Sequence, residues 1–526
     1  MRIAGRWSPV LALAVVGALY FPGIVAPGAG TFHDDGIYLV TAQGLAEGDG
    51  YRIVSLPDAE LQTKYPPLFP ISLAAVWRLA PEFPANLPVL RLLTVFWILL
   101  WCRFAYLVLR RERDRPTALV IALLTLCSPW VYFLATSMMS EGLFAVLTWA
   151  ALWEYLGYED RPDEPAGRRR LLLAAVLGGA ATLTRLLGVS LIGACFVALL
   201  VRRRVRDALV FAAVSAAVVT PWIAWTTLAG SSGPDGYYTA ANYWSWNLVT
   251  GFSLAEAAIV AGRNLFFFFF LTPGYLFGFF GSQSTLLLLA LGLLTLTGLA
   301  ARLRRGPNVL DLFLLVYAVM VLLWPWPPTR FFAPLYPLIL LYAWSGVETV
   351  WRILQGGAPP GALLRRLIAG TALILAVAML GASSLAVTRT GMIAPTPVCH
   401  DDWREFERLF AWVEARTSKD AVLAANLDPA LFLYTGRKAL RPFEADPAEL
   451  YYSRKADREP LGPPAELARR LRAAGADYLV TTPGTCFGET AFLNRQVDAL
   501  LDHGGGTLRE VARLSAATRV YAGRPE

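Results

Sequence analysis

Residues 88–109 read PVLRLLTVFWILLWCRFAYLVL and are followed at once by RRER at residues 110–113. An α-helix rises 1.5 Å per residue, so about 20 apolar residues cross the roughly 30 Å hydrocarbon core of a membrane. A cluster of arginines beside such a run is typical of the cytoplasmic side. This stretch therefore predicts a transmembrane helix and the direction in which it crosses.

Apolar runs of similar length recur along the chain. Of its 526 residues, 56% are hydrophobic and only 16% are charged, whereas about a quarter of a soluble domain is charged. Residues 171–201 could form one long tilted helix, but the charge pattern favours two shorter ones. The predicted fold class is an all-α polytopic membrane protein. We expect about eleven transmembrane helices (ten if 171–201 is one), at residues 7–27, 88–109, 116–135, 142–157, 171–184, 186–201, 208–229, 284–301, 309–327, 332–351 and 367–387.

The first of these runs resembles a secretory signal, because Arg2 and Arg6 precede it. The run is about 20 residues long, however, and Pro27 lies inside the stretch of small residues at its end, which makes a poor cleavage site. We therefore expect an uncleaved first helix.

The arginines also indicate how the helices are oriented. If the N-terminus is cytoplasmic, every arginine cluster falls on the cytoplasmic side, as the positive-inside rule requires. The net charge of +8 then reflects membrane topology, and we expect no nucleic-acid partner. The predicted location is the plasma (inner) membrane, with multiple passes. The clusters lie at residues 110–113, 168–170, 202–204, 302–305 and 365–366.

The same orientation places three segments outside the membrane. They are a first outer loop at residues 28–87, a second outer loop at 230–283, and the tail from residue 388. We divide the chain into a transmembrane domain, residues 1–387, and an exported domain, residues 388–526, in the periplasm or outside the cell. Chemistry is therefore to be sought on the outer face.

The exported domain has the pattern of a small α/β soluble domain. Helical periodicity at residues 401–416, 464–474 and 489–502 alternates with short buried strands at residues 421–425 and 477–482.

The second outer loop is rich in Tyr, Trp and Gly and then runs through five phenylalanines at residues 266–270. Such a segment favours a helix that lies in the membrane interface over one that crosses the membrane.

Cysteines and histidines are few. Cys399 and Cys486 both fall in the exported domain and could form a disulfide in an oxidising compartment, the alternative being two buried thiols. The three histidines and five cysteines of the chain are too scattered to predict a Cys/His metal cluster.

Two adjacent carboxylates, Asp34 and Asp35, lie just outside the first helix in the sequence HDDGIY, residues 33–38. A carboxylate at this position can act as a general base. Alternatively, one of the two caps a short helix expected at residues 36–46. Taken alone, the pair favours capping.

Other charges are expected at the same membrane face. Lys64 precedes YPPLFP at residues 65–70, and a lysine at the membrane surface is a ready phosphate ligand, although many such lysines only snorkel. Glu141, Arg185 and Arg330 lie at outer helix ends, where ionisable groups are functional candidates. The alternatives are purely structural roles: Glu141 could stabilise a helix N-terminus, and the whole set could form an ion-pair network.

The order of these motifs resembles that of the GT-C glycosyltransferases, specifically the protein O-mannosyltransferase and aminoarabinose-transferase-like family (glycosyltransferase family 39). The resemblance covers most of the chain. Each motif is degenerate alone, but their order and sidedness are specific. The motifs are HDDGIY at residues 33–38, GDGY at 48–51, KYPPL at 64–68, SE at 140–141, LTR at 183–185 and RFFAP at 330–334.

The resemblance implies a GT-C-like fold and inverting transfer of a sugar from a polyprenyl-phosphate donor to an acceptor hydroxyl on the outer face. It also implies that one aspartate of the pair is the base and that the lysine contacts the donor phosphate. Positive charge suits a phosphate leaving group, which the two arginines could also supply. The candidate site comprises the catalytic Asp34 and Asp35, the phosphate-binding Lys64, Arg185 and Arg330, and the substrate-binding Tyr65 and Glu141.

Several features stay open. The sugar could be a hexose, a pentose or an amino sugar, and the acceptor a glycan, a lipid or a protein. The family commonly has glutamate after the first-loop acid, whereas this chain has two aspartates, so the choice of base is open. No cofactor is assigned. A divalent metal is allowed, although Thr63 stands where metal-binding relatives place ligands near the lysine motif.

Two further expectations concern the class of protein and its partners. Besides the donor and acceptor, membrane lipid is a partner. The alternative from another class is a lipid-linked sugar flippase or transporter, because intramembrane charges can also line a translocation path. The exported domain resembles those of some relatives at residues 433–437 and is expected to hold the acceptor or to close the outer face.

Overall fold

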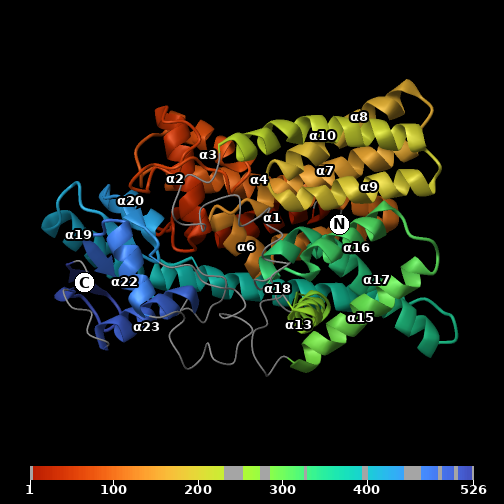
Figure 1. Cartoon of the computed structure of the whole chain (residues 1–526). Coiled ribbons are helices and arrows are strands. Elements are labelled where there is room, and N and C mark those ends of the chain that lie inside the picture. Colours follow the sequence, from red (N-terminus) through yellow and green to blue (C-terminus); the bar gives the residue numbers. More distant parts are fainter. Residues whose placement is uncertain are drawn as a thin grey trace.

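The structure is a computed structural model that describes residues 4–229, 253–272, 285–324, 328–393, 401–442, 464–483, 488–502 and 508–523. Figure 1 shows a bundle of long helices lying side by side, with an α/β domain packed at one end. We call this end of the bundle the domain end and the opposite end, where the loops carry the arginine clusters, the arginine end.

The bundle contains long helices and several short ones. Those before the second outer loop are α1 Ala4–Val25, α2 Asp34–Glu47, α3 Leu68–Leu79, α4 Leu87–Glu112, α5 Arg115–Leu126, α6 Pro129–Thr136, α7 Glu141–Glu159, α8 Pro165–Thr182, η1 Leu186–Gly188, α9 Val189–Val201 and α10 Val205–Leu228. The later ones are α13 Leu254–Phe266, η3 Phe267–Leu271, α15 Thr285–Leu303, α16 Val309–Leu322, η5 Thr329–Leu335, α17 Tyr336–Leu354 and α18 Ala362–Thr390. Proline opens α4, α5, α6, α8 and α17, because its missing N–H costs nothing in a first turn.

Not all of these helices have the length and composition of a membrane span. Within the described residues six qualify, or seven if the bent pair α5 and α6 counts as one span. The predicted count of eleven is therefore not confirmed. The six are Leu87–Glu112, Val205–Leu228, Leu254–Leu271, Thr285–Leu303, Thr329–Leu354 and Ala362–Thr390.

The prediction of one continuous helix at residues 116–135 is wrong. The helix α5 ends at Leu126, α6 begins at Pro129, and the two are bent by 54°. Proline lacks an N–H, and its ring disfavours a helical conformation in the residue before it, so Pro129 favours a new helix start at this point.

The two helices favoured over residues 171–201 are present. The helix α8 ends at Thr182 and α9 begins at Val189. The two helices pack against each other: a Cβ added at Gly178 of α8 would lie 3.4 Å from the side chain of Ile192 in α9. Figure 1 shows α8, α9 and α10 side by side in one half of the bundle.

The phenylalanine run lies in α13 and η3. Figure 1 shows α13 nearly end-on, so it runs across the direction of the long helices. The buried Asn264 amide donates to the carbonyls of Val321, Leu322 and Trp324 at 2.9–3.0 Å, which fixes α13 to the end of α16. Because this segment is also long and apolar enough to span, its placement in the interface stays a prediction.

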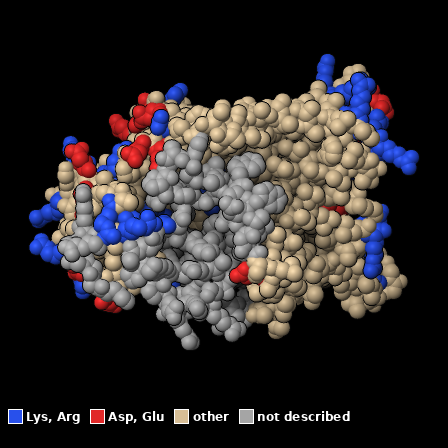
Figure 2. Space-filling model, in the orientation of Figure 1, with Lys and Arg blue, Asp and Glu red and all other residues tan. Residues whose placement is uncertain are grey.

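Charge is concentrated at the two ends of the molecule. Figure 2 shows Lys, Arg, Asp and Glu at both ends and a broad, almost uncharged band between them. Such a band is expected where lipid surrounds a protein. Ion pairs join the loops of the arginine end: Arg111–Asp160 at 2.7 Å, Arg113–Glu348 at 2.7 Å, Arg204–Asp163 at 2.6 Å and Arg302–Glu112 at 2.9 Å.

Helices α15 and α17 pack with their backbones in contact. A Cβ added at Gly298 would overlap the carbonyl of Tyr342, and one at Gly346 would overlap the carbonyl of Leu294. Small residues at a crossing allow such close approach, which is a common way for helices to associate in membranes.

We expect Gly346→Ala to lower the thermal unfolding temperature, because the added methyl group forces the two helices apart at a cost of about 1–3 kcal/mol. Gly370→Ala in α18 is the matched control, since nothing lies within 4 Å of its added methyl group. Thermal unfolding of both purified variants in detergent measures the difference. Equal unfolding temperatures would contradict the close contact.

The α/β domain contains a five-stranded sheet of order β2-β1-β3-β5-β4. Strands β2, β1 and β3 are parallel, whereas β5 is antiparallel to β3 and to β4. The expected strands correspond to β1 and β3, while β2, β4 and β5 were not expected. The elements are α19 Trp403–Arg416, β1 Leu423–Ala425, α20 Asp428–Thr435, β2 Ala439–Leu440, α22 Pro464–Ala473, β3 Tyr478–Val480, α23 Gly488–Asp502, β4 Arg509–Arg513 and β5 Arg519–Ala522.

Helices cover both faces of this sheet. Leu423 and Ala425 of β1 pack with α19 and α20, whereas Ala424 packs with α22 and α23. This alternation follows from the two-residue period of a strand. Cys399 and Cys486, the candidates for a disulfide, lie outside the described residues. Free thiols are buried in the bundle at Cys102, Cys127 and Cys195.

Candidate functional site

The loop before α2 is a tight turn held by Asp35. One oxygen of its carboxylate accepts the N–H of Gly30 at 2.8 Å, and the other accepts those of Phe32 and Gly36 at 3.1 and 2.9 Å. Burial raises the pKa of Asp35 to about 7, although the amide bonds oppose this. Since backbone donors occupy both oxygens, Asp35 holds the turn together.

Asp34, the first residue of α2, faces other side chains. The Tyr65 hydroxyl donates to one carboxylate oxygen at 2.5 Å, and the Arg330 guanidinium donates to the other. Burial by itself would raise the pKa of Asp34, but Arg330, Lys64 and the Tyr65 hydrogen bond outweigh it and hold the pKa well below its ordinary value. Asp34 is therefore ionised at neutral pH.

Two arginines and a glutamate continue the network. Arg185 Nη1 lies 2.9 Å from Glu141 Oε1, and Arg330 Nε lies 3.9 Å from the same oxygen. Arg185 also donates to the Ser140 hydroxyl at 2.9 Å. Both guanidinium groups lie over the ring of Phe331, at 4.9 and 5.1 Å from its centre. The arginines are thus held in place by both charge and aromatic contact.

The lysine motif is positioned by its own loop. The Gln62 side chain accepts the N–H groups of Lys64 and Tyr65 at 2.9 and 3.1 Å. The ammonium of Lys64 lies 5.3 Å from the centre of the Tyr65 ring. The N–H of Leu68, where α3 begins, donates to the Leu183 carbonyl at 3.0 Å, which ties this loop to the break between α8 and α9.

The candidate residues therefore meet at the domain end. Asp34, Tyr65, Arg330, Glu141 and Arg185 form one chain of contacts, and Lys64 lies close enough to lower the pKa of Asp34. Asp35 lies beside them but bonds to the backbone.

A metal ion does not fit this arrangement. Among the residues that the structure describes, no group of three or more His, Cys, Asp or Glu side chains could hold one. Asp34 and Glu141 are already paired with arginines, and both oxygens of Asp35 accept backbone N–H groups. We therefore assign no role to a metal.

Reasoning from the sequence did not single out one important residue, Arg91. Arg91 lies in α4 and is fully buried, and it donates to the Thr136 carbonyl at 2.8 Å and to the carbonyls of Ala26 and Gly28. It thereby fixes the end of α1 and the start of the loop that leads to Asp34. The sequence did contain a signal, because an arginine inside an apolar run is costly and usually has a functional or structural role.

We expect Arg91→Met to reduce both stability and activity. Methionine has a similar length but no hydrogen-bond donors. Each buried carbonyl that loses its partner would lower the free energy of unfolding by about 1–3 kcal/mol. Arg103→Met, in the same helix but exposed, is the control. Thermal unfolding and the yield of monodisperse protein measure the effect. Similar values for both variants would show that Arg91 does not hold the loop.

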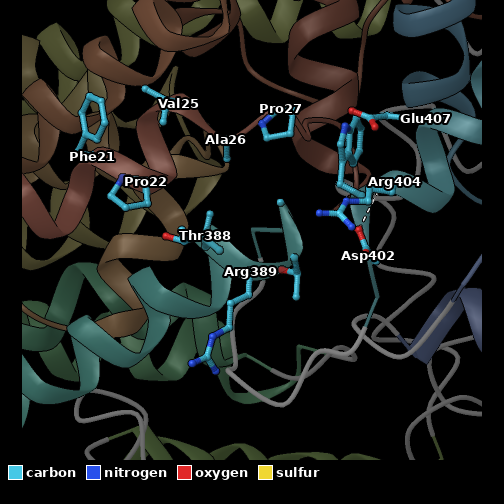
Figure 3. Close-up of a pocket in the computed structure, with 14 residues that line it drawn as sticks. Phe21, Pro22, Val25, Ala26, Pro27, Thr388, Arg389, Asp402, Arg404 and Glu407 are labelled. Atoms are coloured by element: carbon cyan, nitrogen blue, oxygen red, sulfur yellow. Dashed lines mark hydrogen bonds between the residues drawn. The ribbon is translucent and has the colours of Figure 1, made fainter.

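A separate cavity of about 530 Å³ lies between α1, α18 and α19. Figure 3 shows Phe21, Val25 and Pro27 on one side and Thr388 and Arg389 on another. None of the seven candidate residues lines this cavity. It is a junction between the bundle and the α/β domain and takes no part in the charge network.

Comparisons with known proteins show the fold. No protein-family model matches the chain, and no curated protein sequence is significantly similar to it. ArnT from Cupriavidus metallidurans bound to undecaprenyl phosphate is similar with a TM-score of 0.57 and 16% identity, covering 98% of this chain and 97% of that chain. In the apo state of ArnT the TM-score is 0.58, with 16% identity, 99% of this chain and 98% of that chain.

The Archaeoglobus fulgidus oligosaccharyltransferase, tethered to an acceptor peptide containing the NVT sequon, is also similar. Its TM-score is 0.57 with 12% identity, covering 98% of this chain and 74% of that chain. Both relatives are glycosyltransferases of the GT-C fold. The chain thus has the GT-C fold, as its motifs predicted.

Proposed function

We propose that the protein is a membrane glycosyltransferase that moves a sugar from a polyprenyl-phosphate donor to an acceptor hydroxyl, with inversion, at the domain end. The observation that carries this proposal is the Asp34 carboxylate, held between the Tyr65 hydroxyl and the Arg330 guanidinium. The fold supports it, because ArnT binds undecaprenyl phosphate and the oligosaccharyltransferase takes an acceptor peptide.

The proposed reaction uses Asp34 as the general base. The acceptor oxygen attacks the anomeric carbon of the sugar while its proton passes to Asp34. The bond from that carbon to the phosphate oxygen breaks, and the phosphate leaves with both bonding electrons. Lys64, Arg185 and Arg330 stabilise the negative charge that it gains, so no acid is required.

Donor binding activates the base in this scheme. A phosphate group competes with a carboxylate for an arginine, because guanidinium donors match both. When the donor draws Arg330 away from Asp34, the carboxylate loses its strongest stabilising charge, and its pKa rises towards that of a useful base. The donor is therefore expected to bind before the acceptor is deprotonated.

The orientation follows the charge distribution. The arginine clusters and the uncharged band support a cytoplasmic N-terminus and an exported α/β domain in the plasma or inner membrane. The donor is then used on the outer face. Its sugar is a hexose or pentose, and its acceptor a glycan, lipid or protein.

Sugar transfer by protein reconstituted in liposomes tests the proposal. Donors are a panel of radiolabelled polyprenyl-phosphate sugars, the acceptor is a membrane extract, and the control is Asp34→Asn. Labelling that depends on one donor and is lost in the variant supports the proposal and names the sugar. Labelling by both proteins would reject Asp34 as the base. Donor movement between leaflets without any labelling would indicate a flippase.

A further inference from the structure

The residue before the candidate base has an unusual backbone. His33 has φ 69° and ψ −57°, and it directly precedes Asp34 at the start of α2. A residue with a Cβ rarely adopts a positive φ, because its Cβ then crowds the backbone. Such a conformation persists only where the surrounding structure enforces it.

A side chain of the α/β domain helps to enforce it. His33 Nε2 lies 3.1 Å from Asp428 Oδ1, and both side chains are buried. Asp428 is the first residue of α20 and lies 395 positions further along the chain. A contact between two such distant residues fixes the turn from outside its own loop.

The next residues of α20 fill the space over the same turn. A Cβ added at Gly36 would lie 2.7 Å from that of Pro429, and one at Gly30 would lie 3.1 Å from that of Ala430. The two glycines flank the acidic pair and allow α20 to rest on the backbone. The turn that presents the base is therefore packed between α20 and the bundle.

We propose that Asp428, acting through His33, is a positioning residue that holds Asp34 in its reactive orientation. The α/β domain is then part of the active site and does more than hold the acceptor or close the outer face. This inference rests on the proposed function. It concerns the conformation of the turn, so it can also be tested without the reaction.

Other contacts keep the domain docked when this one is removed. The Tyr434 hydroxyl donates to the Pro27 carbonyl at 2.7 Å, and the Ala439 N–H donates to the Ser55 carbonyl at 2.9 Å. The Lys438 ammonium donates to the Val54 carbonyl at 2.6 Å. Removing the Asp428 carboxylate should therefore free the turn without separating the two parts of the protein.

The experiment compares four single variants and one double variant, Asp428→Leu with His33→Gly, of the full chain in liposomes. Asp428→Leu removes the acceptor at similar volume and should lower kcat by about 10- to 100-fold, the effect of a base displaced by about 1 Å, with the donor KM unchanged. Asp428→Asn keeps an acceptor oxygen for His33 and should restore kcat to near that of the wild type. Lys438→Met is the docking control and should leave kcat unchanged.

His33→Gly separates positioning from stability. Glycine adopts positive φ without strain, so the unfolding temperature should change little while kcat falls as in Asp428→Leu. The double variant should be no slower than either single one, because both remove the same contact. Additive losses, or a loss that follows the unfolding temperature across the set, would overturn the proposal.

Hydrogen–deuterium exchange of the wild type and Asp428→Leu provides the readout that needs no sugar transfer. Residues 30–36 should exchange faster in the variant, while the strands of the α/β domain should not. Unchanged exchange of this turn would overturn the inference. Faster exchange in a protein that transfers no sugar would keep the coupling and reject only the proposed function.

Discussion

Asparagine in place of Asp34 is expected to lower kcat by about 10²- to 10⁴-fold, the usual contribution of a general base. Asparagine has the shape of aspartate and can still accept the hydrogen bond from Tyr65, but it cannot take the proton of the acceptor. The unfolding temperature should change much less than the rate. Initial rates of sugar transfer at saturating donor and acceptor measure the effect.

Two other aspartates of the first outer loop are controls for this result. Asp58 is exposed, and Asp58→Asn should leave kcat unchanged. Asp35→Asn places an amide N–H₂ among three backbone N–H donors, so it should lower the yield of folded protein as well as the rate. A fully active Asp34→Asn, beside an inactive but folded Asp35→Asn, would exchange the roles of the two residues.

Arg330→Gln is expected to produce the second large effect, a fall in kcat of about 10²- to 10³-fold. Glutamine can still donate a hydrogen bond but carries no charge to stabilise the leaving phosphate. Arg389→Gln removes an exposed arginine at the same end of the bundle and is the matched control. Loss of activity in both variants would indicate a general effect of surface charge.

The pH dependence of sugar transfer by Arg330→Gln tests whether Asp34 is the base. The base must be deprotonated, so activity is lost as the pH falls through its pKa. In the wild type that pKa is well below the ordinary value of about 3.9, and the rate should hold in mild acid. Without Arg330, burial raises the pKa of Asp34, and the acid limb of kcat/KM should move to higher pH. An unmoved acid limb would mean that another group is the base.

Five expected segments correspond to helices that are long and apolar enough to span a membrane: 88–109, 208–229, 284–301, 332–351 and 367–387. Apolar periodicity failed at residues 116–135, because Pro129 interrupts the backbone hydrogen bonds without interrupting the apolar pattern. It also missed β4 in the α/β domain, whose five residues REVAR are only partly buried and carry little strand signal.

The site was predicted as a set of charges at one membrane face, and the structure brings four of them, Asp34, Glu141, Arg185 and Arg330, into one chain of contacts. The sequence could not distinguish Asp34 from Asp35, because the difference lies in which backbone N–H groups reach each carboxylate. Those distances depend on a turn packed against a helix from the far end of the chain. The spacing of residues in the sequence does not predict such a long-range contact.

The contact between His33 and Asp428 can form only late in synthesis of the chain. Ribosomes add about 5–20 residues per second, so Asp428 is synthesised on the order of 20–80 s after His33, across the 395 positions between them. During that interval the turn that carries Asp34 has no α20 packed against it. A chain whose translation stops before Asp428 would lack the contact that holds this turn. In the proposed mechanism, completion of the chain, rather than insertion of its helices, is the event that orients Asp34.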